Sequence, residues 1–120
     1  MTWAATLAGT NARPGVIQYD INLDGGDDGE SAAFDLSMCD AVSIQADGTW
    51  DSGDAAVQCS NDGVTYADLP TDVAFTADGV KTIPADGLGF KFYQIAVLLN
   101  GATFDVDFVV IGTLKGKARA

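Results

Sequence analysis

A two-residue alternation of apolar and polar side chains recurs along the chain and constrains its fold more than any other feature. In the stretch 16–23, every second residue from Ile17 to Leu23 is apolar. Successive side chains of a strand point to opposite faces, so this spacing is typical of strands with one buried and one exposed face. The same spacing recurs at 34–38, 42–47, 55–60 and 104–110.

Turn-forming residues separate these stretches. Asx-Gly pairs, which suit the positive φ angles of hairpin turns, occur at 24–25, 47–48, 62–63, 78–79, 86–87 and 100–101. The run 90–99 is broken only by Lys91 and Gln94, which predicts a central strand covered on both faces. We expect residues 104–114 to pair with it through a hairpin at 100–103. Residues 30–47 could hold a helix, but their alternation favours strands.

About eight short strands in a chain of 120 residues predict an all-β fold, either an antiparallel β-sandwich or a jelly roll. A small barrel is the structural alternative. The length suits one domain. We expect an extended N-terminal arm at 1–15, which lacks strand periodicity, then a β-sandwich domain at 16–114 and a basic C-terminal tail at 115–120.

The charge balance restricts the partners. The chain carries 17 acidic and 6 basic residues, a net charge of −11, whereas contacts to nucleic-acid phosphates need clustered Lys and Arg. No apolar run has the length of a membrane span, and the first residues lack the basic region of a signal peptide. We therefore expect folding in a reducing cytoplasm, with Cys39 and Cys59 as free thiols and Cys59 pointing into the core.

The residues offer little for catalysis. The sequence contains no His, the commonest general base and metal ligand. It has no Gly-rich loop that opens a helix and no Cys spacing suited to zinc. We expect a protein that is not an enzyme and that holds no cofactor.

The densest acidic group lies in the loop 23–31 and comprises Asp24, Asp27, Asp28 and Glu30. Hard oxygen ligands on a loop suit Ca²⁺, although the spacing is not that of an EF-hand. The loop is therefore either a weak calcium candidate or a solvated turn.

Trp50 lies next to a turn and has two possible roles. An aromatic side chain at a loop tip can stack on a sugar or anchor a protein contact. Alternatively, Trp50 caps one end of the sandwich core.

The two ends of the chain are candidate interaction segments. Trp3, Leu7 and Arg13 lie in the expected arm, which either docks on a partner or folds back on its own domain. The tail is either solvated or contacts an acidic neighbouring subunit. Its basic residues are Lys115, Lys117 and Arg119.

One part of the chain carries a resemblance. A strand ending in Gly-Thr at 48–49 precedes a second strand and the turn Ser60-Asn-Asp-Gly-Val-Thr-Tyr66, and the apolar Leu69 follows. A later strand has the sequence Phe92-Tyr-Gln-Ile-Ala-Val97. This arrangement, over residues 42–97, resembles small virion proteins of tailed bacteriophages.

The resemblance implies a capsid decoration (cement) protein. Such a protein lies on the outer capsid surface, binds the major capsid protein and bridges neighbouring capsomers. It associates with copies of itself, with a homotrimer favoured. Residues 1–15 would then grip the shell or an adjacent subunit.

Two other functions remain open. The turn at 60–66 is also similar to one in discoidin-like and other carbohydrate-binding sandwiches, which implies a module of a phage tail, fibre or baseplate that binds sugar at Trp50. A calcium-dependent domain is the third possibility, and it would lose thermal stability in chelator.

Overall fold

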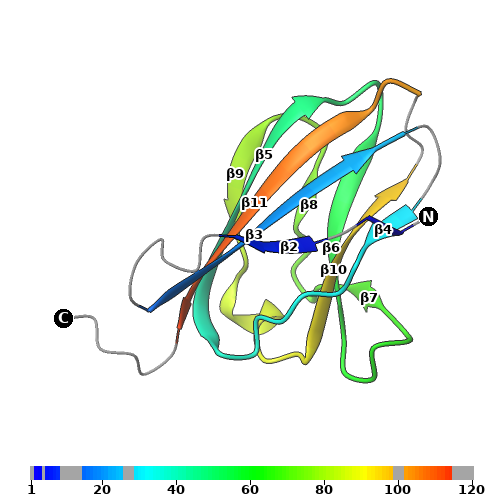
Figure 1. Ribbon diagram of the computed structural model, residues 1–120. Coiled ribbons are helices and arrows are strands. Elements are labelled where there is room, and N and C mark those ends of the chain that lie inside the picture. Colours follow the sequence, from blue (N-terminus) through cyan, green and yellow to red (C-terminus); the bar gives the residue numbers. More distant parts are fainter. Residues whose placement is uncertain (1, 4, 9–14, 26–28, 99–101, 115–120) are drawn as a thin grey trace.

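The computed structural model describes residues 2–3, 5–8, 15–25, 29–98 and 102–114 (Figure 1). Among them, eleven strands form two sheets, and eight of these strands contain three residues or more. The prediction of an antiparallel β-sandwich is confirmed. No helix of this described part has the length and apolar character needed to cross a membrane.

Sheet A has the strand order β1-β4-β10-β6-β7, and β8 also pairs with β6. Sheet B has the order β2-β3-β11-β5-β9. In sheet A the bounds are β1 (Thr2–Trp3), β4 (Gly29–Ser31), β6 (Asp54–Ser60), β7 (Ala67–Asp68), β8 (Ala74–Phe75) and β10 (Phe92–Leu98). In sheet B they are β2 (Ala5–Ala8), β3 (Val16–Asp24), β5 (Cys39–Thr49), β9 (Gly79–Thr82) and β11 (Asp105–Leu114), and a 3₁₀ turn, η1, covers Ala85–Gly87.

The alternation predicted from the sequence places one face of each long strand in the core. Leu23 of β3, Ile44 of β5 and Phe108 of β11 have no solvent exposure, and Val57 of β6 has none in the opposite sheet. These side chains meet between the two sheets, as in other aligned sandwiches. The strands predicted at 16–23, 42–47, 55–60 and 104–110 are therefore confirmed.

The predicted hairpin between 90–99 and 104–114 is wrong. Strand β10 lies in sheet A between β4 and β6, whereas β11 lies in sheet B between β3 and β5, so the chain changes sheets between them. Each apolar strand occupies the middle of its own sheet, and their buried faces meet across the core. The second face of β10 is only half-buried, and Gln94 and Ala96 lie on it.

The predicted strand at 34–38 is also wrong. Phe34 and Leu36 are buried as expected, but Phe34 makes only an isolated bridge to Tyr93, and Met38 is 61% exposed. A turn causes this difference, because the Cys39 N–H donates to the Leu36 carbonyl at 3.0 Å. The turn reverses the chain before β5 and rotates Met38 away from the core.

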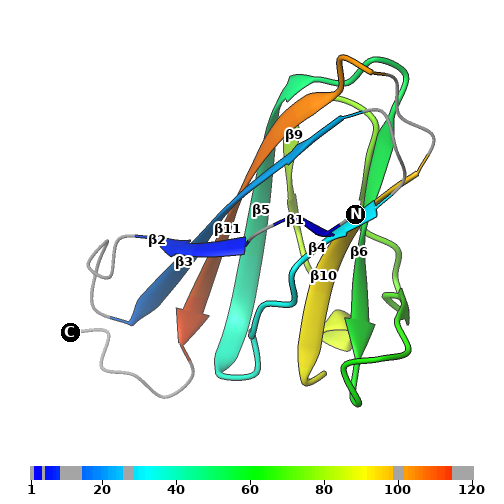
Figure 2. The same ribbon diagram turned by 45° about the vertical axis from the view of Figure 1, so that its right-hand side comes forward.

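Within the expected arm at 1–15, residues 2–3 and 5–8 pair with strands of the sandwich, which agrees with the alternative that the arm folds back on its own domain. Strand β1 pairs in parallel with β4, with Trp3 opposite Ser31. Strand β2 pairs antiparallel with β3, with Leu7 opposite Tyr19. Figure 2 shows β1 and β2 beside these two partners. Backbone hydrogen bonds need no side-chain periodicity, so alternation could not reveal this pairing.

Candidate functional site

The turn after β6 is held in one shape by a network of hydrogen bonds. The Ser60 hydroxyl accepts the N–H groups of Asp62, at 3.2 Å, and Gly63, at 2.9 Å. The Asp62 carboxylate accepts the N–H groups of Val64, at 2.8 Å, and Thr65, at 2.9 Å. The Thr65 bond, followed by the Val64 bond, lowers the pKa of Asp62.

This turn closes the predicted hairpin, because β7 returns antiparallel to β6 with Ala67 opposite Cys59. It carries two side chains along the outer face of sheet A. Val64 is 82% exposed, and Tyr66 is half-buried.

A β-bulge lies across the sheet from this turn. Glu30 is opposite Ala96, and Phe34 is opposite Tyr93. Between these two pairs the chain advances by four residues from Glu30 to Phe34, but by only three residues along β10, so the first segment holds one extra residue. Inside the bulge, the Ser31 hydroxyl takes the place of a backbone acceptor and receives the Ile95 N–H at 3.0 Å. An extra residue of this kind bends the strand locally.

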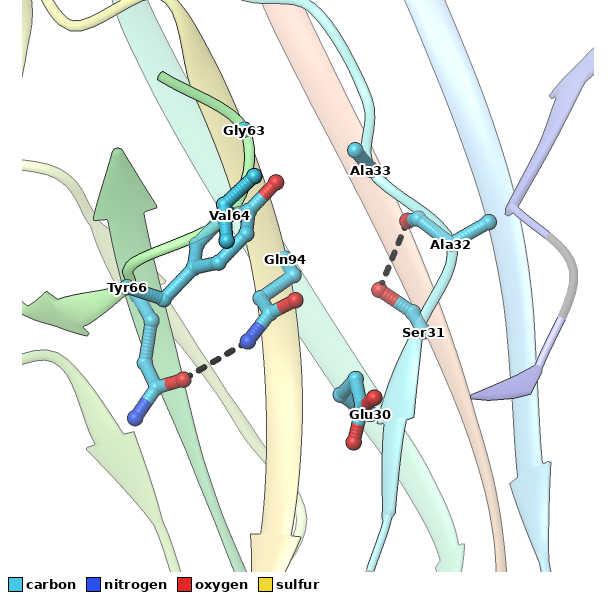
Figure 3. Close-up of a pocket in the computed structure, with 9 residues that line it drawn as sticks. Glu30, Ser31, Ala32, Ala33, Gly63, Val64, Tyr66 and Gln94 are labelled. Carbon is cyan, nitrogen blue, oxygen red and sulfur yellow. Dashed lines mark hydrogen bonds between the residues drawn. The ribbon is translucent and has the colours of Figure 1, made fainter. Parts of the chain in front are cut away.

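A pocket of about 520 Å³ lies between the bulge and the turn. Figure 3 shows residues 30–33 on one side, the turn residues Gly63, Val64 and Tyr66 on the other, and Gln94 of β10 between them. Gln58 of β6 also lines it. The volume is within the range of about 300–1,000 Å³ that is typical of small-molecule sites.

A chain of two hydrogen bonds fixes the orientation of the amide side chains in the middle of the pocket. The Gln94 Nε2 donates to the Gln58 Oε1 at 2.8 Å, and the Gln58 Nε2 donates to the Asp68 carboxylate at 3.3 Å. Within the described part of the chain, the Gln94 carbonyl oxygen, its second N–H and the Tyr66 hydroxyl have no hydrogen-bond partner. These groups are therefore available to a ligand.

The structure places Trp50 at the end of the core and not in this pocket. Its ring makes edge contacts with Phe104 and Phe108, at centroid distances of 5.7 and 6.1 Å. Its Nε1 donates to the Asp78 carboxylate at 2.9 Å, which is the main reason that the pKa of Asp78 is lowered. The core-capping alternative accounts for this position.

The other candidate residues are dispersed or lie outside the described residues. Trp3 and Leu7 are in β1 and β2, where the backbone alone is described. Asp24 ends β3, and Glu30 lines the pocket. Outside the described residues lie Arg13, Asp27, Asp28, Lys115, Lys117 and Arg119. No group of three or more His, Cys, Asp or Glu in the described ranges could hold a metal ion, and the calcium set stays a prediction.

Both cysteines are buried thiols, and Cys59 points into the core as predicted. Burial, with a smaller contribution from the charge of Asp68, raises the pKa of the Cys59 thiol. A raised thiol pKa lowers the thiolate fraction and therefore the reactivity of Cys59.

The sequence reasoning missed the pocket. One signal for the pocket was present in the sequence, because Gln94 interrupts an otherwise apolar run. A strand that is buried on both faces rarely contains an amide side chain. The bulge at 31–34 left no recognisable signal, since Ala32 and Ala33 fit many structures.

No family model and no curated protein matches the sequence. Among solved structures, the SPBc2 prophage-derived protein YomS is similar, with a TM-score of 0.61 and 9% identity over 87% of this chain and 99% of that one. A cupin domain from Bordetella pertussis Tohama I has a TM-score of 0.52 and 16% identity over 93% of each chain. The PBSX exported protein XepA has a TM-score of 0.51 and 15% identity over 84% of this chain and 37% of that one. At these identities, the similarities show the fold alone.

Proposed function

We propose that this chain is a non-enzymatic structural protein of a tailed bacteriophage, which binds the outer surface of the capsid and bridges neighbouring capsomers. The observation that carries the proposal is the similarity to YomS, a prophage-derived protein, over 87% of this chain and 99% of that one. The PBSX exported protein XepA shares the fold over 84% of this chain. The resemblance of residues 42–97 to small phage virion proteins adds to the support for the proposal.

Attachment of this kind needs surface complementarity and repeated copies, without any chemical step. Strand addition is one suitable mode, because the backbone of an edge strand can pair with another chain. Strand β9 lies at the edge of sheet B, its four residues are exposed, and Val80 is 64% exposed. We assign this edge to the contact with the major capsid protein or with another copy in a trimer.

The outer face of sheet B would remain in solvent. Asp20 of β3 and Asp105 and Asp107 of β11 are exposed there. The Asn22 amide donates to the carboxylates of Asp105, at 2.8 Å, and Asp107, at 2.7 Å, and so holds the two acids side by side. A face with this charge keeps assembled particles apart at low salt.

Quantitative mass spectrometry of purified phage particles from the source lysate tests the proposal. A decoration protein should be present in hundreds of copies, comparable to the major shell protein. A known tail protein of the same particle is the internal control, because its copy number is low. A handful of copies would favour the tail, fibre or baseplate alternative, and absence from the particles would overturn a virion role.

A further inference from the structure

We propose that the pocket on the outer face of sheet A is a binding site for a neutral oligosaccharide. The pocket is defined by Tyr66, Gln94, Gln58, Glu30 and the bulge residues Ala32 and Ala33 (Figure 3). This inference is separate from capsid attachment and does not depend on it.

The polar groups of the pocket suit hydroxyl groups. A sugar hydroxyl both donates and accepts a hydrogen bond, and a carboxamide offers both functions in one plane. The Gln94 amide is held by its bond to Gln58, at 2.8 Å, and Gln58 is held by Asp68, so neither amide has to be ordered when a ligand binds. The Glu30 carboxylate adds acceptors at one end of the pocket.

The Tyr66 ring supplies an apolar surface beside these amides. The C–H faces of a pyranose ring are apolar, and an aromatic side chain offers a large, rigid contact for them together with a polar hydroxyl. The turn that carries Tyr66 is fixed by the bonds of Ser60 and Asp62, so the ring is positioned in advance. Val64, which is 82% exposed, extends the apolar surface.

Charge selects a neutral ligand. None of the nine residues that line the pocket is Lys or Arg. Glu30 is among them, and the Asp68 carboxylate accepts a hydrogen bond from Gln58, which also lines the pocket. Anionic sugars and phosphates would meet only negative charge here. A simple cation would need acceptors alone and would leave the amide N–H groups without partners.

The shape of this surface favours more than one sugar ring. Gln58 also lines a second depression of about 180 Å³, whose floor includes Ala56, Ala74 and Ala96. The small side chains leave room along the sheet, and both depressions lie on its face. An extended peptide would pair with a sheet edge instead, and it is therefore a less suitable occupant.

The test is a titration of the full chain, labelled with ¹⁵N, against cellohexaose, maltohexaose, laminarihexaose and chitohexaose. We expect at least one of them to bind with a millimolar or lower Kd and to shift the side-chain amide signals of Gln58 and Gln94. Binding should weaken by about tenfold or more in Tyr66→Ala and in Gln94→Ala.

The matched control is Gln45→Ala, which removes an exposed amide from β5 in the opposite sheet and should change the Kd less than about twofold. Thermal melts of every variant check that the fold is intact. The proposal is overturned if none of the four hexasaccharides binds at about 10 mM, or if Tyr66→Ala binds as well as the parent chain. Tighter binding of a uronic-acid oligosaccharide or of a basic peptide would overturn it as well. The copy number in particles is measured without saccharide, so the two proposals can fail separately.

Discussion

The hydroxyl of Tyr93 lies inside the core, where the side chain has no solvent exposure. It donates to the Gly87 carbonyl at 2.8 Å and accepts the Phe90 N–H at 3.3 Å. Burial is the main reason that the pKa of Tyr93 is raised. Through these bonds, one residue of β10 holds the segment 87–90 against sheet A.

Replacing this hydroxyl should be costly. In Tyr93→Phe, the Gly87 carbonyl is left without its partner in a buried position, and we expect a loss of about 1–3 kcal/mol in the free energy of unfolding. Tyr66→Phe is the matched control, because it removes an exposed-face hydroxyl and should change stability by less than about 0.5 kcal/mol. Urea unfolding followed by Trp fluorescence measures both, and equal stabilities would contradict the role assigned to Tyr93.

Glycine is required at position 48 for a different reason. Gly48 of β5 is opposite Val106 of β11, and a Cβ atom built there would overlap the Asp105 carbonyl oxygen and lie 2.7 Å from the Val106 Cα. We expect Gly48→Ala to cost about 1–3 kcal/mol, since backbone must move. Gly79→Ala in β9, where a Cβ meets nothing within 4 Å, is the control and should be near neutral. A chemical denaturation series that gave both variants the same midpoint would refute this.

The Asp62 carboxylate should make stability depend on pH. Its pKa is lowered in the folded chain, so its contribution is present above the unfolded value of about 3.9 and is lost as the pH falls through the folded value. We therefore expect the difference in melting temperature between the parent and Asp62→Ala to shrink between about pH 6 and about pH 2.5. The exposed Asp72→Asn is the charge control. A difference that stays constant with pH would argue against the ionised form of Asp62.

At the scale of elements, the N-terminal strands give the sandwich its two outer edges on one side. Strand β1 is the edge of sheet A and β2 is the edge of sheet B. One short segment therefore contacts both layers, through β4 and through β3. Unpaired edges are liable to join other chains, and this segment covers two of them.

Deleting residues 2–8 should leave a folded but weakened domain. The long strands β3, β5, β6, β10 and β11 remain, and we expect the melting temperature to fall by about 5 °C or more. The newly exposed edges of β3 and β4 should promote association. Circular dichroism and size-exclusion chromatography measure the two effects, with a deletion of 115–120 as a control of similar length. An unchanged melting temperature would mean that β1 and β2 contribute nothing to stability.

At the scale of the whole molecule, electrostatic repulsion dominates the behaviour of separate copies. The net charge of −11 opposes self-association at low ionic strength. Salt limits the range of this repulsion, because the screening length is about 10 Å at an ionic strength of 0.1 M and about 3 Å at 1 M.

If copies of this chain form the expected trimer, salt should promote it. We expect the average mass in sedimentation equilibrium to rise between about 20 mM and about 500 mM NaCl. Asp107→Asn removes one negative charge from the outer face of sheet B and should slightly raise the average mass at low salt. A monomer mass under both salt conditions would contradict the homo-oligomer.

The sequence by itself determined the class of fold and, for most strands, which face is buried. Alternation depends on which side chains are buried, and burial acts on each strand separately. The prediction for β3, β5, β6 and β11 was therefore correct to within a few residues, and the hairpin at 61–63 followed from turn chemistry. Within the candidate site, Tyr66 and Gln94 could be noticed as unusual residues, but their neighbours could not be assigned.

Only the tertiary structure decided which strands are neighbours. Backbone hydrogen bonds are the same for every residue type, so nothing in residues 90–114 distinguishes a hairpin within one sheet from strands in opposite sheets. For the same reason, β1 and β2 were not recognised as edge strands. The pocket depends on the neighbours of β10, because it forms where the 31–34 bulge and the 60–66 turn lie on either side of that strand. Contacts between segments that are distant in the sequence create this site, and no local sequence pattern predicts such contacts.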